Sequence, residues 1–191
     1  MAEKKLQTEK VGLPSKGLLY PEGSPLSDGT IEVKYMTAKE EDILTNQSFI
    51  KSGVVIDKLL EALVVSPINF NDILIGDKNA ILIAARATGY GPEYEATVVC
   101  PSCSHKHEHT IDLVNLPIKE VPDGINVSPS GTFSVQLPVT KFSVELKILT
   151  AKEQKYLDST REANKKNNLP ESNRTDLLKM VVVSINSVSV R

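Results

Sequence analysis

The residues with the clearest chemical potential are two cysteines at the spacing of a metal-binding turn. Cys100 and Cys103 are the only cysteines in the sequence, and they enclose Pro101 and Ser102. Two thiolates three positions apart at a tight turn can both face one zinc ion, as in the knuckle of a zinc ribbon. The sequence therefore predicts a turn that supplies two of the four ligands of a tetrahedral zinc ion.

The three histidines of the sequence lie just after this turn and are candidates for the other two ligands. They alternate along a predicted strand, so His105, His107 and His109 share one face of it. The predicted ligands of one structural zinc are Cys100, Cys103, His107 and His109. The strand has to curl back sharply to close such a site within one chain, and a site shared between two chains avoids this difficulty.

Other interpretations of the Cys-x-x-Cys hairpin stay open. It is also the form of a ribbon half that folds without metal, or of two ordinary reduced thiols. A redox pair is less favoured, because redox motifs normally open a helix and this one is flanked by strands. A metalloenzyme would need a general base beside an open catalytic position; no residue near the hairpin is typical of one, and Glu108 is left open. No phosphate-binding glycine loop or nucleophile elbow occurs in the sequence, so we do not expect an enzyme.

Composition and charge narrow the class of protein. Of 191 residues, 40% are hydrophobic and 24% are charged, which is typical of a globular protein. The formal net charge of −2 argues against a dedicated nucleic-acid binder, because phosphate contacts need a basic face. The apolar stretches are shorter than the ~18 residues that span a bilayer. The opening residues contain no apolar signal-peptide segment, so we expect folding in a cytoplasm.

Residues 1–30 are predicted to form an extended arm. Glycine or proline interrupts most of this segment every two to five positions, which prevents a helix or a long strand. The segment nevertheless carries apolar residues that should be buried somewhere. These predicted partner-binding residues are Leu13, Leu18, Leu19 and Tyr20. The surface that they cover is either a partner's or the chain's own, and the sequence leaves both possibilities open.

The elements that must position these residues alternate between strands and helices. The pattern predicts strands at 31–36, 93–99, 105–113, 132–137 and 142–149, and helices at 38–46, 53–66 and 77–89. The third of these helices is expected to be capped by Asp77. The cysteine turn therefore connects two strands of a hairpin.

Two segments recur later in the sequence. Lys34-Tyr35-Met36-Thr37-Ala38-Lys39-Glu40 is echoed by Lys147-Ile148-Leu149-Thr150-Ala151-Lys152-Glu153, 113 positions later. Each contains a Thr-x-x-Glu capping box, which begins a helix directly after a strand. In the same order, residues 59–66 are echoed by residues 177–184, 118 positions later. The spacing predicts an internal duplication of a strand–helix–helix unit.

We therefore predict an α+β protein in which two related strand–helix–helix units bracket a β-rich middle with a zinc-ribbon-like Cys-x-x-Cys hairpin. The expected boundaries are an arm at 1–30, a first unit at 31–92, the hairpin and loop at 93–131, and a second unit at 132–191. The second unit has no counterpart of the helix at 77–89 before Arg191. Either the chain continues beyond this point or a partner completes the second unit.

Several segments together resemble the T4-type phage baseplate hub protein family. They are the arm Leu13-Pro14-Ser15-Lys16-Gly17-Leu18-Leu19-Tyr20, the stretch from Arg86 to Gly91 that leads into a strand, and Cys100-Pro101-Ser102-Cys103 with Ile111-Asp112-Leu113 downstream. The resemblance implies a protein without enzymatic activity that helps to assemble the central hub of a contractile tail baseplate. It implies work in the host cytoplasm, as a structural subunit of the virion or as an assembly factor that leaves.

The expected partners are other phage baseplate hub proteins, with a homo-oligomer as a further possibility. No membrane span is expected, and nucleic acid is not an expected partner. The alternative function is a zinc-ribbon adaptor that contacts nucleic acid through Lys106 and the three histidines. A metalloenzyme at the same hairpin is the less favoured alternative.

Overall fold

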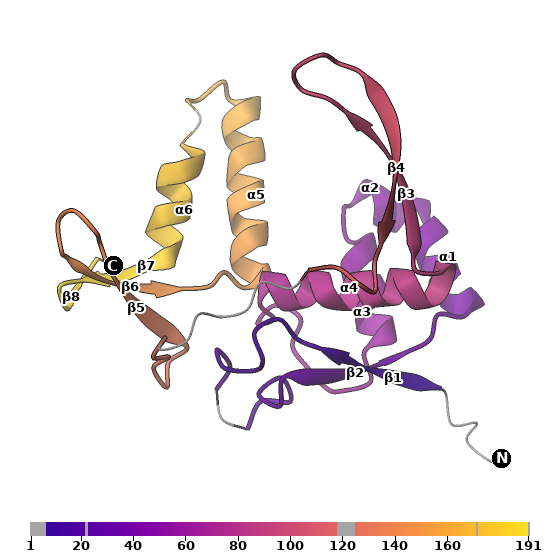
Figure 1. Cartoon of the computed structure of the whole chain (residues 1–191), viewed down its shortest axis with the longest axis horizontal. Helices are drawn as coiled ribbons and strands as arrows, with labels where there is room; N and C mark the ends of the chain where they lie inside the picture. The colour runs from indigo at the N-terminus through magenta and orange to yellow at the C-terminus, as the bar shows by residue number, and fades with distance from the viewer. Residues whose placement is uncertain (1–6, 22, 118–124, 171, 191) are drawn as a thin grey trace. The chain divides into compact units, whose positions relative to one another are not determined.

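The computed structural model describes residues 7–21, 23–117, 125–170 and 172–190, and these divide into two compact units. Unit 1 falls within Met1–Val11, Ile31–Ser66 and Asn79–Lys119. Unit 2 falls within Gly12–Thr30, Pro67–Lys78 and Glu120–Arg191. The fold is mixed, with helices and several small sheets (Figure 1). No helix of the described residues is both long enough and apolar enough to cross a membrane.

Unit 1 contains two small antiparallel pairs of strands and a group of helices. Its elements are β1 (Thr8–Gly12), β2 (Thr30–Lys34), α1 (Ala38–Thr45), α2 (Gln47–Lys51), α3 (Val55–Leu63), the later part of α4 (Ile75–Tyr90), β3 (Glu93–Val99) and β4 (Lys106–Asp112). β1 pairs with β2, and β3 pairs with β4. Apolar residues of β2, α3 and α4 form its core, and they are Ile31, Val33, Leu59, Leu60, Leu63, Ile81 and Ala85.

Unit 2 is built around one four-stranded sheet. Its elements are β5 (Thr132–Gln136), β6 (Ser143–Lys147), α5 (Ala151–Lys166), α6 (Asn173–Val181), β7 (Val182–Ile185) and β8 (Val188–Ser189). The strands lie in the order β5-β6-β7-β8, and each neighbouring pair is antiparallel. Residues 71–75 run beside the beginning of α5, where the N–H of Ala151 donates to the carbonyl of Ile73 at 2.8 Å.

Most of the predicted elements are present, with shifts at their ends. The strand predicted at 93–99 has the observed bounds of β3, and the helix predicted at 53–66 is the shorter α3. The strands β1, β7 and β8 and the short helix α2 were not predicted. The predicted cap at Asp77 is wrong, because α4 begins at Ile75 and the Asp77 carboxylate instead accepts hydrogen bonds from Ser15 and Tyr20.

The two predicted capping boxes are confirmed. In each, the glutamate also binds the lysine that lies three residues before the capping threonine. In unit 1, the Glu40 carboxylate accepts from the backbone N–H of Thr37 at 2.9 Å and from Lys34 Nζ at 2.9 Å. In unit 2, Glu153 accepts from the backbone N–H of Thr150 at 3.1 Å and also binds Lys147. Each glutamate thereby joins the end of a strand to the first turn of the next helix.

In both units, the residue that follows the nine-residue helix pairs with the strand that precedes the capping box. Val64, the residue after α3, bridges Val33 of β2, and Val182, the residue after α6, pairs with Leu146 of β6. Both α3 and α6 are nine residues long, and Val64 and Val182 are both extended. A strand, a capped helix and a nine-residue helix therefore follow one another in both units, and the short α2 lies between the two helices of unit 1 only.

Candidate functional site

The part of the arm that belongs to unit 2 forms a closed loop. The N–H of Leu13 donates to the carbonyl of Gly29 at 2.8 Å, and successive turns lie between these two residues. Gly17 has φ +77°, and a Cβ at this position would lie 2.2 Å from the carbonyl oxygen of Ser27. Leu13 and Leu26 are buried. The loop is thus a packed part of unit 2.

A buried carboxylate anchors the arm to the first turn of α4. Asp77 is 1% exposed, and it accepts from the backbone N–H of Ser15 at 3.0 Å, from Ser15 Oγ at 2.6 Å and from the Tyr20 hydroxyl at 2.7 Å. The Tyr20 oxygen accepts in turn from the N–H of Leu74 at 2.9 Å. The first turn of a helix also favours a negative charge. These contacts give Asp77 a structural role.

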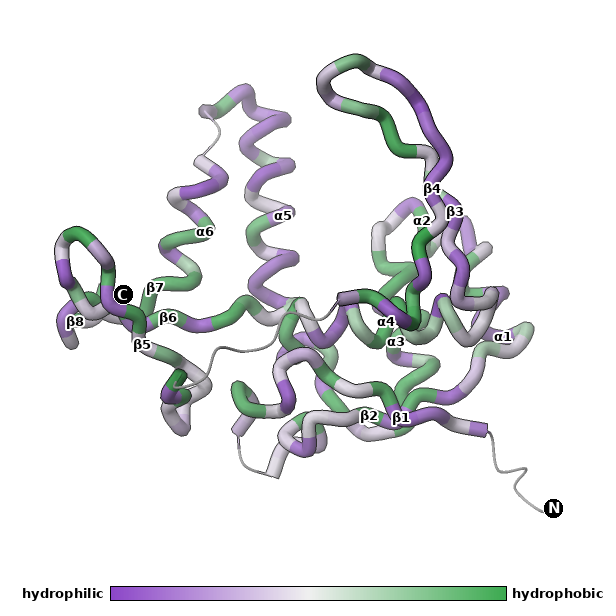
Figure 2. The backbone as a smooth tube through the Cα atoms, viewed as in Figure 1, coloured by the Kyte–Doolittle hydropathy of each residue, from purple (hydrophilic) through white to green (hydrophobic). Residues whose placement is uncertain are grey.

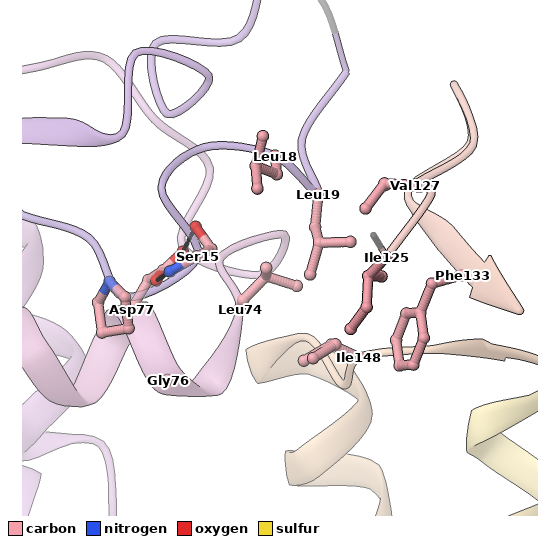
Figure 3. Close-up of a pocket in the computed structure, with 11 residues that line it drawn as sticks. Ser15, Leu18, Leu19, Leu74, Gly76, Asp77, Ile125, Val127, Phe133 and Ile148 are labelled. Atoms are coloured by element: carbon pink, nitrogen blue, oxygen red, sulfur yellow. Dashed lines mark hydrogen bonds between the residues drawn. The ribbon is translucent and has the colours of Figure 1, made fainter. Parts of the chain in front are cut away.

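An apolar pocket of about 230 Å³ lies beside this anchor, within unit 2. Figure 3 shows the side chains of Leu18, Leu19 and Leu74 on one side of it, and those of Ile125, Phe133 and Ile148 on the other. Pro14, Ser15, Gly76, Asp77 and Val127 complete the lining. Several rim residues remain accessible, because Leu18 is 55% exposed and Ile148 is 42% exposed. The pocket is therefore open to an incoming apolar group.

The four predicted partner-binding residues have different places in this arrangement. Leu18 and Leu19 line the pocket, whereas Leu13 is only 4% exposed and Tyr20 is held by Asp77 and Leu74. Sequence reasoning missed the opposite wall. Ile125 and Val127 alternate, which is typical of a short extended segment, and Val127 does bridge Phe133 of β5.

The cysteine turn connects β3 and β4 of unit 1. The N–H of Cys100 donates to the carbonyl of His105 at 2.9 Å, and the N–H of Ser104 donates to the carbonyl of Cys100 at 2.8 Å. Hydrogen bonds from the backbone of Cys103 and Ser102, and from the Cys103 thiol, lower the pKa of Cys100. Amide groups directed at a sulfur in this way stabilise its thiolate, which is the form that binds metals.

The structure does not bring the predicted zinc ligands together within one chain. The pairing of β3 with β4 holds His107 opposite Val98 and His109 opposite Ala96, so both histidines lie along the strand and away from the turn. Among the residues that the structure describes, no three His, Cys, Asp or Glu side chains lie close enough to hold a metal ion. Zinc binding stays a prediction. Of the four predicted ligands, Cys100 and Cys103 are the two that lie at the same turn.

The opposite face of this hairpin is acidic. Glu93 is opposite Asp112, and Glu108 lies on the same face beside Thr97. All of these carboxylates are exposed. Lys106 lies on this acidic face, whereas His107 and His109 lie on the other, so the residues named for the nucleic-acid adaptor do not form one surface.

Comparison with protein families decides the class of the molecule. A sequence model of the family described as T4 bacteriophage base plate protein matches residues 13–191. The chain belongs to the T4 bacteriophage base plate protein family. Searches of curated proteins and of solved structures found no match.

The family match gives this base plate protein a coarse function. It is a structural component of a phage baseplate, and it acts together with other baseplate proteins. The match begins at Leu13, where the closed loop of the arm begins, so this loop and the pocket beside it lie within the matched region.

Proposed function

We propose that this base plate protein is a non-enzymatic interaction component or assembly factor of the central hub. The supporting observation is the open apolar pocket between the arm and the segment that includes Ile125, with Ile148 at its rim. The apolar lining offers few hydrogen bonds to water, so burying an apolar side chain against it is favourable. Apolar cavities of about 150 Å³ already hold a ring the size of benzene, so a pocket of about 230 Å³ has room for one large apolar side chain.

The partner that fits this pocket is another hub protein with a projecting leucine, methionine or phenylalanine. An anchor of this kind, seated in a preformed pocket, is the usual energetic centre of a protein–protein interface. The bonds from Ser15 and Tyr20 to Asp77 hold the arm in place before the partner arrives. A preformed site loses less conformational entropy when it binds.

The test is co-purification of the full chain with hub proteins expressed from the same tail genes. Leu18→Asp places a charge at the pocket rim, and we expect it to abolish co-purification while thermal unfolding stays unchanged. The matched control is Leu169→Asp, because Leu169 is 53% exposed, close to the 55% of Leu18, and does not line the pocket. Equal loss in both variants, or no loss in either, contradicts the proposal. Deleting the arm is a poorer test, since it also removes the buried Leu13 and Leu26.

We further propose that Cys100 and Cys103 supply two of the four ligands of one structural zinc ion, which is shared between two chains. The support is the pair of thiols at one turn, with amide groups directed at Cys100. Elemental analysis should find about half an equivalent of zinc per chain, because a tetrahedral ion takes four ligands. Cys103→Ser should remove the zinc together with the dimer, whereas His109→Asn should retain both. Zinc-free wild-type protein would exclude this site.

A further inference from the structure

A second, more polar pocket adjoins the apolar pocket within unit 2. Its volume is about 360 Å³, and its lining includes three residues that also line the apolar pocket: Leu19, Leu74 and Ile148. Figure 3 shows the side chains of these three residues. Because the two pockets share part of their walls, they are direct neighbours, and one bound segment can enter both.

Charged residues of β6 and α5 line the second pocket and balance each other. Figure 2 shows hydrophobic and hydrophilic colours alternating along β6, which ends at Lys147 directly before Ile148. Lys147 forms an ion pair with Glu153 of α5, and their side chains are only 23% and 18% exposed. Glu153 also accepts from the backbone N–H of Thr150 at 3.1 Å. The charge of Lys147 is therefore neutralised by a residue of the same lining.

Asp72 gives the second pocket an unbalanced negative charge. It lines the pocket and is exposed, and among the described residues no lysine or arginine forms an ion pair with it. Nδ2 of Asn69 donates to Oδ2 of Asp72 at 2.7 Å, which orients the carboxylate. A carboxylate can accept several hydrogen bonds, so Asp72 has room for a donor from a ligand.

We propose that the two pockets together bind one segment of a hub protein, which carries a large apolar residue and, two to four positions away, a lysine or arginine. The apolar side chain enters the apolar pocket, and the cationic group reaches Asp72 in the second pocket. Side chains at this spacing point to the same side of a strand or a helix. The apolar stem of a lysine or arginine also suits the shared wall of Leu19 and Ile148.

The charge of Asp72 selects against other segments. An acidic residue beside the apolar anchor would be repelled by this carboxylate, whereas a basic residue is attracted to it. The inference rests on the proposed function, in which a hub protein inserts an apolar side chain, and it adds the charge of the partner segment.

The first experiment finds the segment by cross-linking. A benzophenone amino acid replaces Pro25, which is exposed and lines the second pocket, in the full chain. The chain is expressed with the baseplate proteins of the same tail and irradiated. We expect a cross-link to another baseplate protein, at a segment with leucine, methionine or phenylalanine and a basic residue two to four positions away. A cross-link to a second copy of this chain or to a segment without that pair overturns the inference, and so does the absence of a cross-link.

The second experiment measures the affinity of the full chain for a fluorescent peptide with the cross-linked sequence. Asp72→Asn keeps an acceptor for Asn69 and removes the charge. It should weaken binding about two- to fivefold at low salt and have little effect at high salt, because salt screens an exposed ion pair. Asp158→Asn is the matched control, since it changes the net charge equally, its side chain is 53% exposed on α5, and it lines neither pocket.

A change in the peptide identifies the partner of Asp72. Replacing the basic residue of the peptide by glutamine should cause the same loss as Asp72→Asn, and the two changes together should cause no further loss. Additive losses overturn the inference, and so does wild-type affinity of Asp72→Asn or an equal loss in Asp158→Asn. All variants should unfold at the wild-type temperature.

Leu18→Asp separates this inference from the proposed function. If Leu18→Asp abolishes peptide binding and Asp72→Asn leaves it unchanged, the apolar pocket binds the partner and only the basic residue is wrong. If Leu18→Asp leaves peptide binding unchanged, the proposed function fails together with this inference.

Discussion

The hydroxyl of Tyr20 donates a 2.7 Å hydrogen bond to Oδ2 of Asp77, 57 positions later in the chain. Burial raises the pKa of Tyr20 above its usual range; the N–H of Leu74 opposes this rise, and Asp77 reinforces it. The hydroxyl therefore stays protonated and remains a donor. Through this bond, the arm and the beginning of α4 depend on each other, and both border the apolar pocket.

Tyr20→Phe should destabilise unit 2 through the loss of that donor. A hydrogen bond to a charged group contributes about 1.5–3 kcal/mol, and a buried carboxylate that loses a donor is left less well solvated. We expect a decrease of this size in the free energy of unfolding, measured by urea denaturation. Tyr156→Phe is the control, since Tyr156 is 61% exposed and should show no change. Equal stability of the two variants would show that the Tyr20 hydroxyl contributes nothing to stability.

The sequence was sufficient to predict the helices whose first turns are stabilised by hydrogen bonds between residues close together in the chain. The Thr37–Glu40 and Thr150–Glu153 boxes begin helices where predicted, because their hydrogen bonds lie within four residues. The Asp77 prediction failed because its partners, Ser15 and Tyr20, are distant in sequence. From the sequence alone, an aspartate that caps a helix cannot be distinguished from one that accepts hydrogen bonds from a distant segment such as the arm.

The candidate site was only half predictable for the same reason. Leu18 and Leu19 stood out as apolar residues in a segment rich in glycine and proline. Ile125 and Phe133 come from a different part of the chain, and only the tertiary structure brings them to the same pocket. His107 and His109 show the opposite case, because strand pairing keeps side chains apart that the sequence places near the cysteines.

Gly17→Ala should open the arm. Alanine at φ +77° is strained, and its Cβ would also lie 2.2 Å from the Ser27 carbonyl oxygen. Gly23→Ala isolates the backbone strain, because Gly23 has φ +82° and no atom within 4 Å of an added Cβ. We expect Gly23→Ala to cost about 1 kcal/mol and Gly17→Ala clearly more, measured by denaturant titration. Similar losses in both variants would contradict the tight closure of the loop.

The stability of unit 1 should fall in acid because of Glu40. Burial raises the pKa of this carboxyl, but hydrogen bonds from Thr37 and Lys34 and the charge of Lys34 outweigh that effect and lower it from 4.5 to about 2. A group with a lowered pKa in the folded state stabilises the fold above its unfolded pKa, and this contribution disappears as the pH falls. The free energy of unfolding should therefore decrease between pH 4.5 and about 2.

Glu40→Gln should reduce the pH dependence in this range, and it should lower the stability at pH 7, since the ion pair with Lys34 is lost. Glu61→Gln is the control, because its side chain is 45% exposed and pairs with Lys58 on the surface of α3. Denaturant unfolding at a series of pH values gives the slope for each variant. A wild-type slope in Glu40→Gln would assign the acid sensitivity to other carboxylates.

The last prediction compares the matched leucines directly. Leu60→Ala removes a side chain that is 0% exposed, so it should cost about 2–5 kcal/mol through lost burial and the cavity that remains. Leu178→Ala changes a side chain that is 58% exposed, so the isolated chain should lose less than about 1 kcal/mol. Urea unfolding of the two variants measures both effects. Equal losses in the two variants would contradict the difference in burial between Leu60 and Leu178.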